Sequence, residues 1–248
     1  GPPNNTLATA MDLRLSSIPL QGVADRMAVL GVADGGNDFY RVELTQGQVM
    51  FASLYALAGG SIDLDMRDSA GTVLSLGQDI PGGKGIFAFQ APTTGSYYLN
   101  VTGLPDADPV TGVPQYSLVV TRGAAVEYLP NDTLATAQVI ALTGQAVGSV
   151  GTRVFPQGGV TVPDSADFYA VLANAGDILT ITTTTPGDGI GEPTNTLDPL
   201  LQLFDPTGAL IATNLDGAPD GRNAVITATA ATAGLYKIGV LPTAGGGD

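Results

Sequence analysis

Carboxylates are almost the only reactive side chains in this chain. Of its 23 acidic residues 20 are Asp, and the chain contains no His and no Cys. This removes the usual general base, the thiolate ligands of zinc and every Ser-His or Cys-His nucleophile pair. With only Lys84 and Lys237 as lysines, a Ser-Lys arrangement is a poor alternative. What remains is acid–base catalysis by paired carboxylates, or the binding of calcium, which prefers oxygen ligands.

The obvious carboxylate pair is Asp63 and Asp65. Glycosidases use such pairs, but residues 62–67 alternate strictly between apolar and charged side chains. The alternation predicts that both carboxylates lie on the solvent face of one strand, and no aromatic platform for a sugar accompanies them. We therefore expect no enzymatic activity.

Two further acidic segments favour turns and loops. Asn214–Gly221 is rich in oxygen ligands but lacks the spacing and the terminal Glu of an EF-hand, so we interpret it as an Asx-rich hairpin. Asp106 and Asp108 stand between prolines, which is typical of a solvated loop.

The elements that must position these residues occur twice. Four motifs recur in the same order: Pro3–Ala10 as Pro130–Ala137, Asp38-Phe39-Tyr40 as Asp167-Phe168-Tyr169, Asp68–Gly71 as Asp205–Gly208, and Gly95-Ser96-Tyr97 as Gly234-Leu235-Tyr236. A duplicated module of this length predicts two tandem domains, not a solenoid. We place them at residues 1–122 and 123–248.

Strand patterns dominate both copies. Residues 62–67 alternate, and two pairs of β runs correspond, Val49–Tyr55 with Ile178–Thr185 and Tyr97–Val101 with Tyr236–Val240. Only the segments after Asn5 and Asp132 could form a helical turn, with those two residues as caps. Short strands with frequent turn signals predict an all-β fold of two tandem, jelly-roll-like antiparallel β-sandwiches.

The two copies differ in length. Copy 2 inserts Thr152–Pro163 and Pro186–Asn195, which we interpret as exposed loops. Copy 1 ends with the alternating segment Gln115–Val120, which has no counterpart in copy 2. We therefore expect copy 2 to lack its last strand and to pair its open edge with a strand beyond Asp248 or from another chain.

The charge of the chain excludes two classes of partner. Its net charge is −14, with 9 Lys and Arg residues, which argues against nucleic acid and against anionic membrane surfaces. No segment approaches the roughly 20 consecutive apolar residues of a membrane-spanning helix, so we expect no membrane insertion.

Taken together, the motifs resemble those of the bacterial pre-peptidase C-terminal domain family, over nearly the whole chain. They are the Asn-Asp-Thr-x-x-x-Ala segment at Asn131–Ala137, the acidic start of the Asp-Phe-Tyr strands and the late Gly-x-Tyr strands. The resemblance implies non-catalytic, jelly-roll-like sandwiches attached to secreted proteases and other exported bacterial proteins. Some members, such as the collagen-binding modules of clostridial collagenases, bind calcium and a fibrous substrate.

The resemblance also implies a calcium site in copy 2. Its ligands would be Glu127, Asn131, Asp132, Asp164 and Asp167, with Asp164-Ser165-Ala166-Asp167 matching the Asp-x-x-Asp pair of the family. Carboxylates this close repel one another without a cation. The alternative is that Asp132 caps a turn and Asp164 starts a loop.

Copy 1 offers a weaker set of ligands. The candidates are Asn4, Asn5, Asp34 and Asp38, and Gly1-Pro2-Pro3 supplies no glutamate, so we expect a defective or truncated site.

Two functions fit these observations. The first is a non-catalytic accessory module of a larger secreted or surface bacterial protein, stabilised by calcium, with neighbouring domains of the same protein as partners. The second is an adhesion module that binds a polymer, whether a protein fibre, a polysaccharide or the cell envelope. An exposed apolar and aromatic patch on one sheet face would favour the second. Tyr97 and Tyr236 are expected to be packing residues, with the hydroxyl bonded to backbone at a strand corner.

Overall fold

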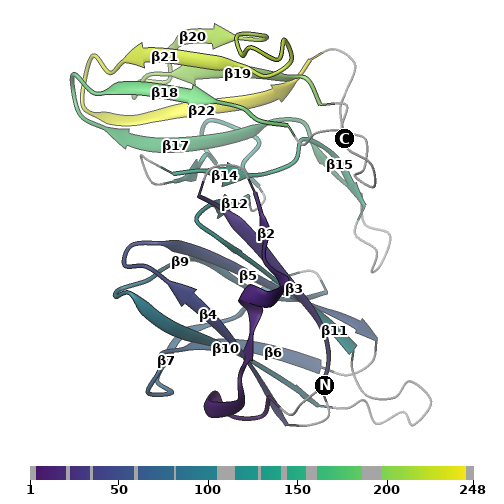
Figure 1. Cartoon of the computed structure of the whole chain (residues 1–248). Coiled ribbons are helices and arrows are strands. Elements are labelled where there is room, and N and C mark those ends of the chain that lie inside the picture. Colours follow the sequence, from purple (N-terminus) through teal and green to yellow (C-terminus); the bar gives the residue numbers. More distant parts are fainter. Residues whose placement is uncertain are drawn as a thin grey trace. The chain divides into compact units, whose positions relative to one another are not determined.

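A computed structural model describes residues 4–20, 23–33, 36–58, 61–80, 82–104, 115–127, 130–140, 144–154, 161–185 and 197–243. The chain divides into two compact units, Gly1–Val126 and Glu127–Asp248, which we call unit 1 and unit 2 (Figure 1). The predictions for Asp34, for Asp106 and Asp108 and for Pro186–Asn195 lie outside the described residues. Among the residues that are described, no helix has the length and hydropathy needed to cross a membrane.

Unit 1 is a sandwich of two sheets. Their strand orders are β1-β4-β10-β6-β7 and β2-β3-β11-β5-β9-β8. All the pairs are antiparallel except β1–β4, which is parallel. In chain order the elements are η1 (Leu7–Thr9), β1 (Met11–Asp12), η2 (Leu13–Ser16), β2 (Ile18–Pro19), β3 (Asp25–Val32), β4 (Asn37–Leu44), β5 (Val49–Ala58), β6 (Ser61–Arg67), β7 (Val73–Leu76), β8 (Gln78–Ile80), β9 (Gly83–Gln90), β10 (Gly95–Leu104), β11 (Gln115–Arg122) and β12 (Ala125–Val126).

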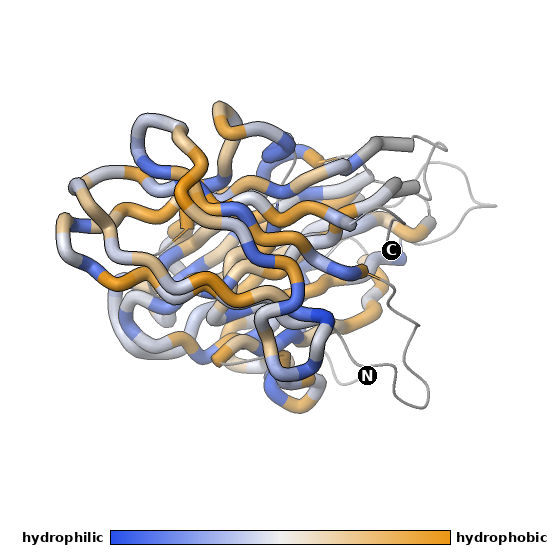
Figure 2. Tube along the Cα trace, turned by 90° about the horizontal axis from the view of Figure 1, so that it is seen from above, coloured by the Kyte–Doolittle hydropathy of each residue, from blue (hydrophilic) through white to orange (hydrophobic). Residues whose placement is uncertain are grey.

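Alternating side chains explain this sandwich. In β6 the apolar residues Ile62, Leu64 and Met66 are buried, as the sequence predicts. They join apolar residues of β4, β5, β10 and β11 in one core cluster between the two sheets. Figure 2 shows the same alternation of apolar and polar residues along the strands. The predicted all-β sandwich class is confirmed.

Unit 2 is built in the same way around its own core. A five-stranded sheet has the order β13-β17-β22-β19-β20, and the described residues add the pairs β15–β16 and β18–β21. Apolar residues of β17, β19 and β22 pack with those of β18 and β21. The strands are β13 (Gln138–Val139), β14 (Ala146–Val147), β15 (Gly151–Val154), β16 (Thr161–Asp164), β17 (Asp167–Ala173), β18 (Ile178–Thr182), β19 (Pro199–Phe204), β20 (Leu210–Asn214), β21 (Val225–Thr229) and β22 (Gly234–Pro242).

The paired sequence motifs occupy matching places in the two five-stranded sheets. The parallel pair β13–β17 matches β1–β4, and β22 and β19 follow β17 as β10 and β6 follow β4. The Tyr97 hydroxyl donates a hydrogen bond to the Thr93 carbonyl at 2.7 Å, and the Tyr236 hydroxyl donates one to the Thr232 carbonyl at 3.0 Å. The prediction that these tyrosines pack at a strand corner is confirmed.

Two local predictions are wrong. The turn caps are Thr6 and Thr133 instead of Asn5 and Asp132, because each threonine hydroxyl accepts the amide hydrogen three residues later at 3.3 Å. The inserted segment Thr152–Pro163 is not simply a loop, because its ends pair in the hairpin β15–β16. Thr152, Val154, Thr161 and Val162 are β-branched and suit strands.

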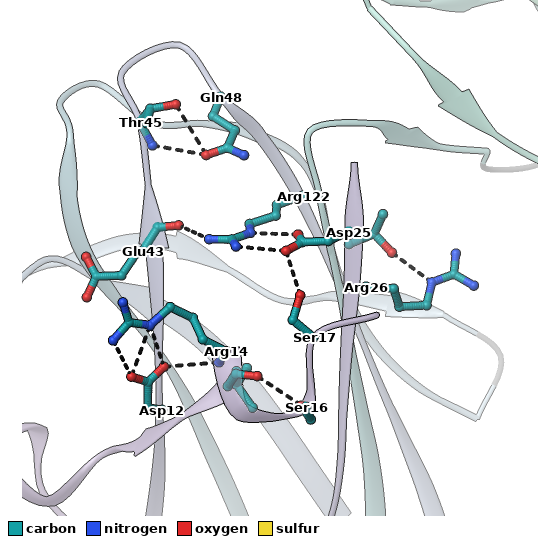
Figure 3. A network of polar contacts seen from close by, with 12 residues as sticks. Asp12, Arg14, Ser16, Ser17, Asp25, Arg26, Glu43, Thr45, Gln48 and Arg122 are labelled. Carbon is teal, nitrogen blue, oxygen red and sulfur yellow. Dashed lines mark hydrogen bonds and ion pairs between the residues drawn. The ribbon is translucent and has the colours of Figure 1, made fainter. Parts of the chain in front are cut away.

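One polar network links the two sheets of unit 1 (Figure 3). Arg122 on β11 donates to both carboxylate oxygens of Asp25 on β3, at 2.6 and 2.7 Å, and also to the Glu43 carbonyl on β4 at 2.6 Å. Ser17 donates a further bond to Asp25 at 2.7 Å. Burial alone would raise the pKa of Asp25, but the bonds from Arg122 and Ser17 hold it below its usual range. This arginine therefore joins three strands from both layers of the sandwich.

Candidate metal centre

The predicted ligands of unit 2 lie at the ends of local elements. Glu127 is the first residue of the unit, Asn131 and Asp132 precede the Thr133 turn, Asp164 ends β16 and Asp167 begins β17. The Asn131 carbonyl accepts the Phe168 amide hydrogen at 2.8 Å. This bond and the parallel β13–β17 pair hold the Asn131 segment at the start of β17, beside Asp167.

Three of the five predicted residues converge. Carboxylate oxygens of Glu127, Asp164 and Asp167 all lie within 4.8 Å of one another. Their exposed fractions are only 6%, 2% and 2%. Two oxygens on opposite sides of a calcium ion are separated by about 4.8 Å, twice the usual ligand distance, so the cluster has the dimensions of a calcium shell. Three buried negative charges this close are costly unless a cation or protons offset them.

Asn131 and Asp132 add further oxygens. Asn131 is fully buried, and neither polar atom of its side-chain amide has a hydrogen-bond partner among the described residues. The buried Oδ1 atom of Asp132 also has none there. Such atoms are rare in folded proteins because each costs desolvation energy, so they point to a ligand. Because Thr133 caps the following turn, the Asp132 side chain is not used for that purpose.

Gly148 fits against this cluster. A Cβ atom on Gly148 would lie 2.5 Å from the Tyr169 hydroxyl oxygen, 2.6 Å from Glu127 Oε2 and 2.9 Å from Asp167 Oδ2. The neighbouring Ser149 amide donates to Glu127 Oε2 at 2.8 Å, and the Glu127 amide donates to the Val147 carbonyl at 2.9 Å. The backbone of residues 147–149 therefore holds the Glu127 carboxylate in place.

Tyr169 completes the surroundings of the cluster. Its hydroxyl donates to Asp167 Oδ2 at 3.4 Å. Burial, followed by the negative charges of Asp167 and Glu127, raises the pKa of Tyr169 far above its usual value, so it stays protonated and acts as a donor. Sequence reasoning missed Gly148 and Ser149, which carry no motif, whereas the repeated Asp-Phe-Tyr motif could have indicated Tyr169.

Asp63 and Asp65, the carboxylate pair on β6, do not share a site. Asp63 is exposed, and its Oδ1 lies 3.8 Å from the Lys84 ammonium. Asp65 was predicted to face solvent, but its side chain is only 16% exposed. The Arg67 guanidinium binds it at 2.6 Å and the Asn100 amide at 3.0 Å, and together they cover it. Both carboxylates therefore have structural partners.

The Asn214–Gly221 segment is rich in Asx turns, as predicted, but it is not a hairpin, because β20 pairs with β19 and β21 pairs with β18. Asn214 Oδ1 accepts the amide hydrogens of Gly217 and Val225. Asp220 accepts bonds from the Asn223 side chain at 2.6 Å and from the amides of Asn223 and Arg222. These bonds, the Asn223 side chain first, lower the pKa of Asp220 to about 2. Protein donors thus bind the side-chain oxygens of Asn214 and Asp220.

Unit 1 lacks a matching cluster of acids in its described residues. Among the residues that the structure describes, Glu127, Asp164 and Asp167 form the one group of three His, Cys, Asp or Glu residues close enough to hold a metal. Of the unit 1 candidates, Asn4 accepts the Phe39 amide hydrogen at 2.7 Å through its carbonyl, as Asn131 does for Phe168. Asp38 accepts a bond from the Tyr116 hydroxyl at 2.6 Å.

The comparisons with known proteins bear on unit 2. Residues 165–242 match the family model of the bacterial pre-peptidase C-terminal domain. The match lies within unit 2 and includes Asp167, whereas the other four candidate ligands precede it. A search of curated proteins found no match.

Several solved structures are also similar. The pre-peptidase C-terminal domain of collagenase from Bacillus anthracis is 20% identical, with 38% of this chain and 88% of that chain covered and a TM-score of 0.32. A periplasmic inhibitor of g-type lysozyme from Aeromonas hydrophila is 16% identical, with 46% of this chain and 95% of that chain covered and a TM-score of 0.32. The tandem CBM22 domains of Xyn10C from Paenibacillus barcinonensis are 10% identical, with 92% of this chain and 81% of that chain covered and a TM-score of 0.23.

Proposed function

We propose that this chain is a non-catalytic accessory module of a larger secreted or surface bacterial protein, and that unit 2 binds a structural calcium ion. The observation that carries the proposal is the convergence of the buried carboxylates of Glu127, Asp164 and Asp167. The family match at residues 165–242 supports the accessory role. Unit 1, with its matching sheet order, would be a second copy of the same domain.

Calcium fits the residues better than other ions. The site offers carboxylate and amide oxygens, which a hard cation prefers, and the sequence has neither the imidazole nor the thiolate ligands that zinc usually takes. Glu127, Asn131, Asp132, Asp164 and Asp167 would hold the ion. It would join the start of the unit to the end of β16 and the start of β17, two adjacent points that are distant from that start in the sequence. Its role would be to fix these segments together, because nothing in the cluster resembles a nucleophile with a base.

Calorimetry and thermal unfolding test the proposal. Calcium should bind with a stoichiometry of about one per chain and should raise the unfolding temperature by mass action, while EDTA should lower it. Asp164→Asn should weaken binding strongly, whereas Asp63→Asn, which alters an exposed carboxylate, should not. No calcium binding and an unfolding temperature unchanged by EDTA would refute the metal site.

The absence of catalysis is tested separately. We expect no turnover of protein or glycoside substrates, because the chain has no His and no Cys and because the carboxylate pair Asp63 and Asp65 has structural partners. Hydrolysis that disappears in Asp63→Asn or in Asp164→Asn would overturn this part of the proposal.

A patch on unit 1 favours polymer binding as a second candidate function. Leu30, Val32 and Leu57 are exposed. Register places Leu30 opposite Ser117 and Ser117 opposite Tyr55, so Leu30 and Tyr55 share the outer face of the six-stranded sheet. The patch combines apolar and aromatic side chains on one sheet face, which is typical of a surface that binds a partner.

Co-sedimentation with insoluble collagen, cellulose, chitin and peptidoglycan tests this second function. The double variant Leu30→Ser, Leu57→Ser should lower the bound fraction. Leu76→Ser removes an exposed leucine from β7 in the other sheet and should leave binding unchanged. Absence of binding to all four polymers, or an equal loss in both variants, would argue against it.

A further inference from the structure

The start of β4 in unit 1 corresponds to the metal cluster of unit 2. Asp38 pairs with Val101 on β10, and Asp167 pairs with Val240 on β22. Two residues later, Tyr40 pairs with Met11 on the parallel strand β1, as Tyr169 does with Gln138 on β13.

The residues that the structure describes at the two places differ in charge. Unit 2 brings three carboxylates together, with Asp164 three residues before Asp167. Three residues before Asp38 the sequence has Gly35, which carries no side chain. The described part of unit 1 thus presents one acid, Asp38, at this place, and a single carboxylate needs a hydrogen-bond donor more than a divalent cation.

Tyr116 supplies that donor from the opposite sheet. It lies on β11, is fully buried and donates from its hydroxyl to Asp38 Oδ2 at 2.6 Å. The Tyr40 and Tyr116 hydroxyl oxygens are 2.5 Å apart, and the two rings meet edge to face. Burial, followed by the bond to Asp38, raises the pKa of Tyr116 well above its usual value, so the hydroxyl keeps its proton.

A glycine makes room for this tyrosine. Gly31 on β3 lies opposite Tyr116 in the register, and a Cβ atom on it would collide with the ring and hydroxyl of Tyr116. In unit 2, the backbone at Gly148 lies against the Tyr169 hydroxyl and the carboxylates of Glu127 and Asp167. In unit 1 the close approach of Gly31 thus lets the Tyr116 side chain reach Asp38.

We propose that the Tyr116 hydroxyl replaces a bound cation in unit 1, bonding to Asp38 where unit 2 uses calcium, so that unit 1 is stable without metal. The inference rests on the calcium site proposed for unit 2. It assigns different requirements to the two units: calcium controls the stability of unit 2, whereas Tyr116 ties the two sheets of unit 1 together at all calcium concentrations.

Hydrogen exchange of the full chain, measured by mass spectrometry, tests this inference. In the wild type, EDTA should speed exchange in residues 167–173 and leave residues 37–44 unchanged. Tyr116→Phe should speed exchange in residues 37–44 about tenfold, equally with calcium and with EDTA. Accelerated exchange in residues 37–44 of the wild type on EDTA addition would overturn the inference. No EDTA effect in residues 167–173 would instead refute the calcium proposal for unit 2.

A double-mutant cycle separates the Tyr116–Asp38 bond from general packing. Tyr116→Phe should have a much smaller effect in an Asp38→Asn background, because the carboxylate that needed the donor is gone. Tyr97→Phe, which removes another hydroxyl of unit 1 bonded to backbone, should have the same effect in both backgrounds. Equal effects of Tyr116→Phe in the two backgrounds would contradict the proposal. If Tyr116→Phe unfolds unit 1, hydrogen exchange of residues 37–44 in the wild type, with and without EDTA, still tests whether unit 1 is stable without metal.

Discussion

Gly148→Ala should weaken calcium binding by unit 2 more than its small size suggests. The added methyl group would lie 2.5–2.9 Å from the Tyr169 hydroxyl, Glu127 Oε2 and Asp167 Oδ2. An ordinary contact needs about 3.4 Å or more, so these oxygens or the backbone must move by about 0.5–0.9 Å. Calcium sites tolerate about 0.2 Å in ligand distance. We expect a loss of affinity of about 10–100-fold, the usual range for groups that orient metal ligands.

Titration calorimetry measures this loss directly, and thermal unfolding with and without EDTA measures its effect on stability. The expected factor corresponds to about 1.4–2.7 kcal/mol of binding free energy. Gly95→Ala is the control, because a Cβ atom on Gly95 would meet no atom within 4 Å. Calcium affinity in Gly148→Ala equal to that of the wild type would show that Glu127 and Asp167 are not both ligands, and the geometric reasoning would fail.

Three further perturbations test the structural framework. Arg122→Met removes both bonds to Asp25 and should cost unit 1 about 2–3 kcal/mol by urea unfolding at pH 7; a loss below about 0.5 kcal/mol would contradict this. The folded-state pKa of Asp25 is lowered. The stabilisation that Asp25 provides is therefore present above its unfolded-state pKa, near 4, and is lost as pH falls through the folded-state pKa. The gap in unfolding free energy between the wild type and Arg122→Met should thus shrink from pH 6 to pH 3. A constant gap would argue against the ion pair. Tyr236→Phe should destabilise unit 2 by about 1 kcal/mol through loss of the bond to Thr232, measured by the same unfolding assay, and no change would show that the corner bond contributes nothing.

The sequence by itself determined the features that depend on local pattern. The alternation of residues 62–67 fixed which side chains of β6 enter the core, because side chains in a strand point to opposite faces in turn. The positions of Tyr97 and Tyr236 in the two Gly-x-Tyr motifs allowed a bond from each hydroxyl to backbone at a strand corner to be expected. The identities of the candidate ligands were also available, because the segments that contain them, such as Asp164–Asp167, resemble a known family pattern.

Only the tertiary structure decided which of these residues meet. Glu127 precedes Asp164 by 37 residues, and they come together because strand register and the Asn131–Phe168 bond bring their segments to one end of a sheet. The close approach of Gly148 and the bond from Tyr116 to Asp38 arise in the same way, from contacts between segments distant in the sequence. No local pattern encodes such contacts, because they depend on the packing of two sheets.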